Sequence, residues 1–349
     1  MKNFKKQFGG KITSDLEAQY QNSPNWTDGS FQNLEETNMS FSFGDIPELL
    51  YKQFIDRTQR EPKEPLAVQA FNKSKFFSED QDSKFAWYGH SAVLMNLNGN
   101  TILIDPMLGN NTSPIAPIPT SRFSENTLAL IDDLPPIDLM IISHDHYDHL
   151  DFDSIKKLKE KTKKYYVALG VKRHLVEWGV SADIITEFDW WDENIFQEIK
   201  ITYTPTRHFS GRGLRDRTKS LWGGWVFEHG NEKIWFSGDG GFGRHFKEIG
   251  ERFGSFDLAF MECGQYNEKW RLIHMFPEES VQAALIAKVK KAIPVHWSAF
   301  ALAQHPWKEP AEQFHKHAAI KGLNAAFPRL GEVFTLESTP TQKWWEELI

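Results

Sequence analysis

From residue 85 onward, short apolar segments alternate with polar turns. Short apolar runs bounded by Gly, Asn, Asp or Pro predict β-strands rather than helices. Asn98-Gly99-Asn100 separates two of these runs and is typical of a hairpin turn. The predicted strands cover residues 85–88, 92–97, 101–104, 137–142, 165–169, 199–204, 224–228, 233–237, 257–261, 293–296 and 332–336.

Other segments repeat their apolar residues at helical spacing. Residues 46–58 predict an amphipathic helix, because Asp45 can cap its start and Pro47 lies in its first turn. That helix would pack on the core or, alternatively, lie on a membrane surface. Asp153 is expected to cap a lysine-rich helix over 153–161, and further helices are predicted over 171–178 and 277–289.

Strands in both halves of the chain, with helices between them, predict a mixed α/β (α+β) fold. Its two sheets would pack face to face with the helices outside. Residues 1–84 are expected to form an arm and a helix packed on the core, anchored by Trp26 and Phe31, and residues 85–349 the main domain. The aromatic pairs at 190–191 and 344–345 would either fill the core or line a cleft for an apolar ligand.

Composition narrows the classes of function. The 349 residues are 40% hydrophobic, enough for a sizeable core, and the net charge of −7 argues against nucleic acid as a partner. Cys263 is the single cysteine, so neither an intramolecular disulfide nor a cysteine-rich zinc site can form. We expect a cytoplasmic protein, since no secretory signal or membrane-spanning stretch is visible. The pattern leaves assembly as a homo-oligomer open.

The segment from His144 to His149 carries the clearest chemistry. It follows the predicted strand 137–142 directly and places His144, His146, Asp148 and His149 within six positions. Residues two apart on an extended loop can point into one cavity, so His144 and His146 can share a metal ion. Asp148 and His149 would then face a second position.

Three further candidate ligands follow apolar strands downstream: His208, Asp239 and His296. Loops at the ends of strands converge on one edge of a sheet, where binding sites form. Asp239 lies between Gly238 and Gly240, so its backbone has room to approach a metal closely.

The order and context of these residues resemble the metallo-β-lactamase superfamily, and within it the N-acylphosphatidylethanolamine-hydrolysing phospholipase D family and its bacterial relatives. The likeness covers about residues 85–310. It extends to the stretch around Phe31-Gln32-Asn33. The matching motifs include Trp87-Tyr88-Gly89-His90, Thr206-Arg207-His208-Phe209-Ser210, Leu221-Trp222-Gly223-Gly224-Trp225, Ser237-Gly238-Asp239-Gly240-Gly241 and His274-Met275-Phe276-Pro277-Glu278-Glu279.

The resemblance implies a four-layer αββα sandwich with two metal ions. One metal would be held by His144, His146 and His208, the other by Asp148, His149 and His296, with Asp239 bridging them. Asp105 and His90 would orient ligands, or else serve as a strand-end cap and a buried hydrogen-bonding group. Nitrogen and oxygen ligands without a thiolate suit two zinc ions, although manganese or iron would also fit.

The resemblance also implies a reaction. A hydroxide shared by the two metals is expected to attack a phosphodiester of the N-acylphosphatidylethanolamine type, with Asp148 and Asp239 holding it. His274 would donate a proton or bind phosphate, or else be structural. The phospholipid substrate would imply peripheral contact with a membrane. The alternatives are a lactonase acting on a sugar-acid phosphate and a metal-binding module without turnover; a long apolar groove favours the lipid, and a small polar pocket the lactone.

One loop is rich in arginine although the protein is acidic. It begins beside His208, and arginine suits bidentate contact with phosphate. One or two of its arginines are therefore expected to bind a substrate phosphate, the alternative being a solvated loop. The candidates are Arg207, Arg215 and Arg217.

Overall fold

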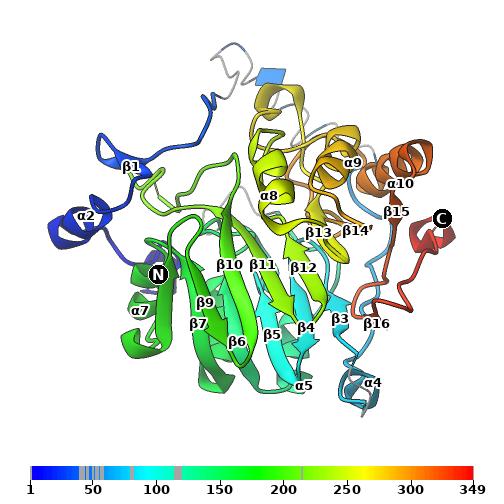
Figure 1. The fold of residues 1–349 in the computed structure, drawn as a ribbon, viewed down its shortest axis with the longest axis horizontal. Coiled ribbons are helices and arrows are strands. Elements are labelled where there is room, and N and C mark those ends of the chain that lie inside the picture. The colour runs from blue at the N-terminus through cyan, green and yellow to red at the C-terminus, as the bar shows by residue number, and fades with distance from the viewer. Residues whose placement is uncertain are drawn as a thin grey trace.

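Two seven-stranded sheets form the centre of the molecule (Figure 1). The computed structural model describes residues 2–38, 44, 47–48, 51, 55, 59–78, 82–113, 120–213 and 215–348. The helix predicted over 46–58 therefore lies mostly outside the described residues.

The first sheet has the strand order β16-β3-β4-β5-β6-β7-β8. Asn98 and Gly99 have φ angles of 50° and 73°, so the predicted hairpin turn between β4 and β5 is confirmed. Strands β5, β6 and β7 pair in parallel, so their carboxyl ends lie at one edge. The strands are β3 (Lys84–Trp87), β4 (Val93–Leu97), β5 (Asn100–Ile104), β6 (Ile137–Ile142), β7 (Thr162–Ala168), β8 (Ile185–Phe188) and β16 (Val333–Thr335).

The second sheet has the strand order β15-β14-β13-β12-β11-β10-β9. Strands β12, β13 and β14 pair in parallel, and β10 runs in the same direction because β11 is antiparallel to both β10 and β12. Strand β15 is parallel to β14, so the carboxyl ends of five strands meet at one edge of this sheet. The strands are β9 (Glu193–Phe196), β10 (Ile199–Pro205), β11 (Gly223–His229), β12 (Glu232–Phe236), β13 (Leu258–Glu262), β14 (Lys291–Val295) and β15 (Asn324–Ala325).

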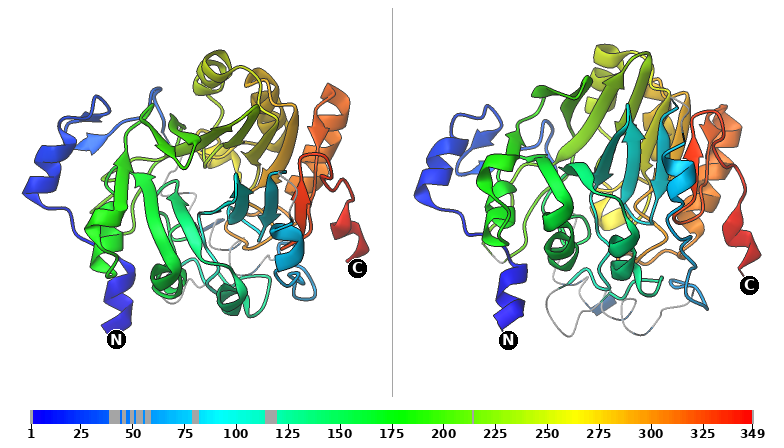
Figure 2. Two further views of the ribbon diagram at one scale, coloured as in Figure 1. Left: turned by 60° about the horizontal axis from the view of Figure 1, so that its bottom comes forward. Right: turned by 90° about the horizontal axis from the view of Figure 1, so that it is seen from below.

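The sheets pack against each other through apolar side chains, with helices on the two outer faces (Figure 2). The rings of Phe85 and Phe260, one from each sheet, lie 6.1 Å apart. This arrangement confirms the predicted four-layer sandwich. The helices are α5 (Leu130–Asp133), α6 (Phe152–Leu158) and α7 (Lys172–Glu177) beside the first sheet, and α8 (His245–Phe253), α9 (Pro277–Ile286) and α10 (Glu309–Lys321) beside the second.

Some local predictions need correction. Asp151, not Asp153, caps α6, because its carboxylate accepts from the backbone of Asp153 and Ser154. Helices α8 and α10 and the short strands β8 and β9 were not predicted. Trp190, Trp344 and Trp345 are buried in the core, so of the two readings of the loop aromatics the structure supports packing.

The N-terminal arm lies along one side of the sandwich (Figure 1). Trp26 and Phe31 anchor it as predicted: both are buried in the main hydrophobic core, and the backbone N–H of Phe31 donates to the carbonyl of Thr218 at 2.9 Å. Within the described residues, no helix combines the length and the apolar character needed to cross a bilayer. The remaining elements before β3 are α1 (Lys2–Gln7), α2 (Ser14–Tyr20), β1 (Trp26–Thr27), β2 (Ser30–Phe31) and α4 (Lys73–Phe76).

Candidate metal centre

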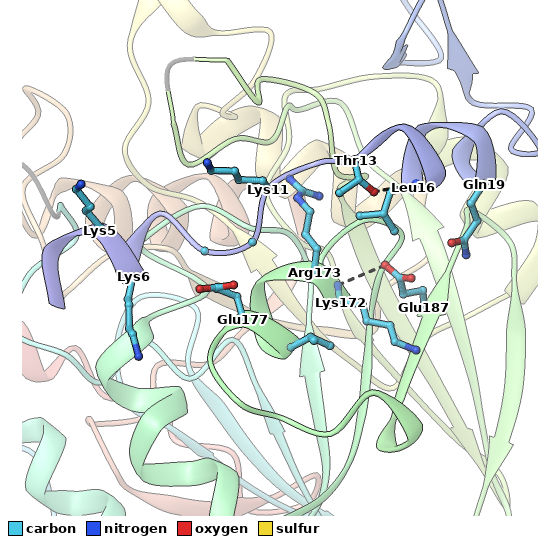
Figure 3. A pocket seen from close by; sticks show the side chains of 13 residues that line it. Lys5, Lys6, Lys11, Thr13, Leu16, Gln19, Lys172, Arg173, Glu177 and Glu187 are labelled. Atoms are coloured by element: carbon cyan, nitrogen blue, oxygen red, sulfur yellow. Dashed lines mark hydrogen bonds between the residues drawn. The ribbon is translucent and has the colours of Figure 1, made fainter. Parts of the chain in front are cut away.

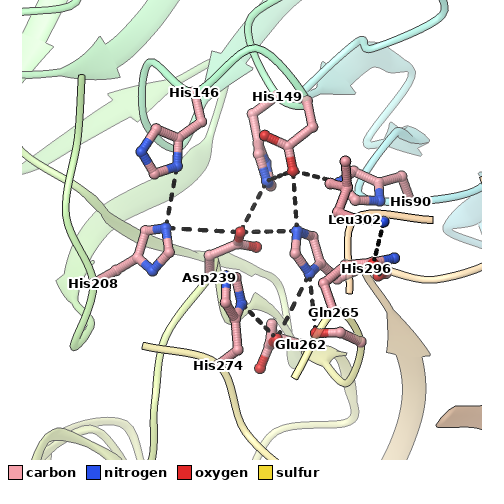
Figure 4. A network of polar contacts seen from close by, with 12 residues as sticks. His90, His146, His149, His208, Asp239, Glu262, Gln265, His274, His296 and Leu302 are labelled. Carbon is pink, nitrogen blue, oxygen red and sulfur yellow. Dashed lines mark hydrogen bonds and ion pairs between the residues drawn. The ribbon is translucent and has the colours of Figure 1, made fainter. Parts of the chain in front are cut away.

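The predicted metal ligands meet between the facing edges of the two sheets (Figure 4). In the first sheet, the ends of β3, β5 and β6 lead to His90, Asp105 and His144. In the second, the ends of β10, β12 and β14 lead to His208, Asp239 and His296. Strand direction therefore explains why residues that are distant in sequence share one cavity.

The first cluster consists of His144, His146 and His208. Nδ1 of His146 lies 2.9 Å from Nε2 of His144 and 3.2 Å from Nε2 of His208. His208 donates from Nδ1 to the carbonyl of Ile273 at 3.0 Å, which leaves its Nε2 directed at the cluster. Three ring nitrogens thus face one point, as ligands of a single cation do.

The second cluster consists of Asp148, His149 and His296, with His90 beside them. Oδ2 of Asp148 lies 3.3 Å from Nε2 of His296 and 3.6 Å from Nε2 of His149. Nε2 of His90 is 2.8 Å from the same oxygen, so His90 orients the carboxylate of Asp148. The four ligand atoms lie within 4.8 Å of one another.

Asp239 lies between the two clusters. Its Oδ2 is 2.9 Å from Nε2 of His296, 3.0 Å from Nε2 of His149 and 3.9 Å from Nε2 of His208. The glycines around it allow this approach: a Cβ on Gly241 would lie 2.2 Å from the backbone of Leu272. The position suits the predicted bridge between two cations.

Asp105 contacts His149 of the second cluster on the side of the ring away from Asp239. Its fully buried carboxylate accepts from the backbone N–H of Ser143 at 2.8 Å and from the Ser143 hydroxyl at 2.5 Å. It also lies 2.8 Å from Nδ1 of His149, which must donate because a carboxylate can only accept. Asp105 therefore leaves Nε2 of His149 to face Asp239, which is the orienting role that the sequence suggested.

The two clusters differ in their electrostatics. Burial, together with neighbouring imidazoles, lowers the pKa of His144 and His208 well below the usual value. Burial also lowers the pKa of His146, to about 4. These three side chains are therefore neutral near pH 7 and able to bind a metal through a lone pair.

The carboxylates of the second cluster attract positive charge. Burial opposes ionisation of Asp148 and Asp239, but the imidazoles around them hold both pKa values well below the usual range. Burial lowers the pKa of His149, but the negative charges of Asp239 and Asp148 outweigh this effect and raise the pKa to about 10. A divalent cation would replace the protons that these histidines otherwise carry. Seven nitrogen and oxygen donors without a thiolate fit zinc, and also manganese or iron.

His274 and Glu262 border the second cluster. Nδ1 of His274 lies 3.1 Å from a carboxylate oxygen of Glu262, and its ring stacks on that of His296 at 5.0 Å. His274 also belongs to a group of possible ligand atoms with His208 and Asp239. Sequence reasoning missed Glu262, although a charged residue ending a buried apolar strand was a usable signal.

Asn33, on the N-terminal arm, was also missed as a functional residue. Its amide N–H donates to the carbonyl of His208 at 2.8 Å, and its amide oxygen accepts from the backbone N–H of His208 at 3.0 Å. The same oxygen accepts from the indole of Trp222 at 3.0 Å. The arm therefore fixes the backbone of a predicted metal ligand. The family likeness around Phe31-Gln32-Asn33 was a signal for this stretch, but it did not indicate the contact with His208.

The three candidate arginines have different surroundings in the structure. Arg207 donates to the carbonyls of Glu36 and Phe242 and to the Thr37 hydroxyl, so it ties the arm to the sandwich. Arg217 is exposed and stacks on Phe209, with 3.9 Å from its guanidinium carbon to the ring centre. The Phe209 ring lies 4.6 Å from that of His146, so Arg217 is one ring away from the first cluster. Arg215 is exposed.

Two cavities lie along the arm. One of about 360 Å³ borders His208 and is lined mainly by polar residues, including Asn33, Glu35 and Arg217. The other, of about 790 Å³, lies between the arm and α7 (Figure 3). Its lysines point in different directions, and none of the predicted metal ligands lines it. Only the smaller cavity adjoins the candidate metal centre.

Comparisons with known proteins agree with this geometry. A family model described as a beta-lactamase superfamily domain matches residues 100–297. An uncharacterised protein of Mycobacterium tuberculosis is 34% identical over 96% of this chain and 91% of its own length. An N-acyl-phosphatidylethanolamine-hydrolyzing phospholipase D of Caenorhabditis elegans is 34% identical over 67% of this chain and 69% of its own.

Solved structures confirm the fold. The metallo hydrolase Igni18 of Ignicoccus hospitalis superposes with a TM-score of 0.56 at 19% identity, over 72% of this chain and 97% of the other. The family model covers more than half of the chain, and within it lie both histidine clusters and Asp239. The chain therefore belongs to the metallo-β-lactamase superfamily of metal-dependent hydrolases and is a relative of the N-acylphosphatidylethanolamine-hydrolysing phospholipases D.

Proposed function

We propose that the protein is a zinc-dependent phosphodiesterase of phospholipase D type acting on N-acylphosphatidylethanolamine-like substrates. The observation that carries the proposal is the pair of ligand clusters joined by Asp239, because paired metal sites suit phosphodiester hydrolysis. The 34% identity to the roundworm phospholipase D supports the substrate class. Cleavage on the ethanolamine side would consume water and release phosphatidate and an N-acylethanolamine. Such a substrate implies contact with a membrane surface.

The residues of the chain have distinct roles in this proposal. Two zinc ions would supply Lewis acidity and a water that ionises near neutral pH. Asp148 and Asp239 lie where they can accept hydrogen bonds from a water between the clusters. His274 presents one ring edge to the same space and can contact a phosphoryl oxygen (Figure 4). Among the described residues the guanidinium of Arg217 stacks on Phe209 and has no hydrogen-bonded partner, so it is available to a phosphate. Arg207 and Arg215 stay predictions.

One observation favours a second candidate. The cavity beside His208 is small and lined mainly by polar groups, which suits a sugar-acid phosphate lactone better than a long acyl chain. Lactone hydrolysis also needs an activated water and uses the same clusters. The first experiment must therefore compare both substrate classes.

The test uses the full chain loaded with zinc. It is incubated with N-acylphosphatidylethanolamine vesicles, with bis-p-nitrophenyl phosphate and with a panel of lactones, and products are identified by mass spectrometry. We expect phosphatidate and N-acylethanolamine from the vesicles. His208→Ala should abolish turnover, whereas His229→Ala, at the far end of β11, should not. Turnover of lactones alone would establish the second candidate, and zinc binding without any turnover would indicate a non-hydrolytic module.

A further inference from the structure

Glu262 is a fully buried carboxylate outside the seven predicted metal ligands, although its ligand atom also lies within 4.8 Å of those of His274 and His296. It ends β13, and the parallel register with β14 pairs it with Val295, the residue before His296. Burial of a carboxylate is costly unless hydrogen bonds compensate it. The contacts of Glu262 therefore indicate why a charge is kept at this position.

The carboxylate of Glu262 contacts residues that border the candidate centre. One oxygen accepts from the backbone N–H of Met275 at 3.0 Å, and the other lies 3.1 Å from Nδ1 of His274. The second oxygen is also 3.6 Å from Nδ1 of His296. The backbone carbonyl of Glu262 accepts from the Ser280 hydroxyl at 2.6 Å, which fixes the residue to α9. The carboxylate is thus held rigidly between two imidazoles.

This geometry determines which nitrogen of His274 carries a proton. A carboxylate can only accept, so Nδ1 of His274 must donate to it. The opposite edge of the ring, with Nε2, then faces Asp239 and His208 (Figure 4). Stacking of the ring on His296, at an angle of 14°, restricts its rotation. Glu262 and the stacked ring together leave His274 one orientation.

We propose that Glu262 is a positioning residue that holds Nε2 of His274 toward the substrate. This inference rests on the proposed hydrolysis, in which His274 contacts an oxygen of the scissile group. Glu262 does not touch the substrate itself, because it lies behind the ring of His274 and is fully buried.

The first test is Glu262→Gln, which keeps the shape and removes the charge. Glutamine has one acceptor oxygen, whereas Met275 and His274 each need an acceptor. If the oxygen serves Met275, the amide N–H₂ faces Nδ1 of His274 and moves the ring proton to Nε2. We expect nitrogen-15 NMR of the histidine rings to show this tautomer change, with His274→Asn used to assign the signal. Glu262→Asp keeps the charge and should retain the original tautomer.

The kinetic test uses whichever substrate the zinc-loaded enzyme turns over. Glu262→Gln should lower kcat by about 10- to 100-fold, the usual effect of removing an orienting partner, while KM stays nearly unchanged. In a His274→Ala background the same substitution should cause no further loss, because the two residues act as one unit. Glu309→Gln, which removes a carboxylate bonded to Tyr266 at 2.6 Å, is the matched control.

The outcomes separate this inference from the proposed function. Loss of one zinc per chain in Glu262→Gln would show that Glu262 supports metal binding by His296 instead, and it would overturn the proposal. So would an unchanged His274 tautomer, or a further loss of kcat when Glu262→Gln is added to His274→Ala. If no phosphodiester is turned over by the wild type, the proposed function fails, but the NMR measurement still decides the role of Glu262.

Discussion

The binding of the second metal should depend on Asp105, although Asp105 belongs to neither cluster of candidate ligands. Asp105→Asn is the informative change, because Asp105 has a φ of 39°, a left-handed conformation that asparagine tolerates better than alanine. The amide can keep one acceptor for the backbone N–H of Ser143. Its N–H₂ then faces Nδ1 of His149, so that nitrogen must accept, and the ring proton moves to the metal-facing Nε2.

The magnitude follows from the bond that is lost. A hydrogen bond to a buried charged group contributes about 1.5–3 kcal/mol. That energy corresponds to a weakening of about 10- to 100-fold in affinity for the second metal, in line with the usual effect of losing an orienting partner. His146 and His208 do not contact Asp105, and His144 is linked to it only through the Ser143 hydroxyl, which lies 2.9 Å from Nδ1 of His144. The first metal should therefore lose less affinity than the second. The variant is expected to bind one zinc tightly and one weakly.

Competition with a chromophoric zinc chelator measures both affinities. Asp138→Asn is the matched control: Asp138 also accepts from a backbone N–H, that of Thr101 at 2.9 Å, but it lies near the start of β6, away from the centre. The reasoning is refuted if Asp105→Asn binds two zinc ions as tightly as the wild type, or if both affinities fall equally.

Further predictions concern the arm, the protons and the arginine loop. Asn33→Ala removes two hydrogen bonds to the backbone of His208, each contributing about 1 kcal/mol. It should slow turnover and make residues 30–38 more susceptible to limited proteolysis, and unchanged proteolysis would contradict this. Zinc binding should release protons near pH 7, because nearby carboxylates, against the effect of burial, raise the pKa of His149 to about 10 and that of His296 well above its usual value. The affinity for zinc should therefore rise with pH, and a pH-independent affinity would contradict this. Arg217→Ala should raise KM for a phosphorylated substrate, and an unchanged KM would remove Arg217 from the site.

Local sequence patterns were sufficient where the chemistry is local. The hairpin at Asn98 and Gly99 needs positive φ angles that these residue types adopt readily, so it was predictable. The cap of α6 was misplaced by two residues, because Asp151 and Asp153 are equivalent as local capping residues. Only the packing of the helix start, where Ser154 also bonds to Asp151, distinguishes them.

The sequence predicted two packed sheets, because apolar strands with helices between them bury their faces against one another, and it placed candidate ligands at the ends of those strands. The resemblance to the metallo-β-lactamase superfamily implied the four layers and the grouping of seven ligands around two metals. Tertiary structure alone decided the contacts made by Asn33 and Glu262. These residues act through hydrogen bonds to groups far away in the chain or in a neighbouring strand, and such bonds depend on strand register and on where the arm crosses the sandwich. A one-dimensional pattern contains neither the strand register nor the path of the arm. The orientation of His208 and His274 could therefore be seen only in the folded protein.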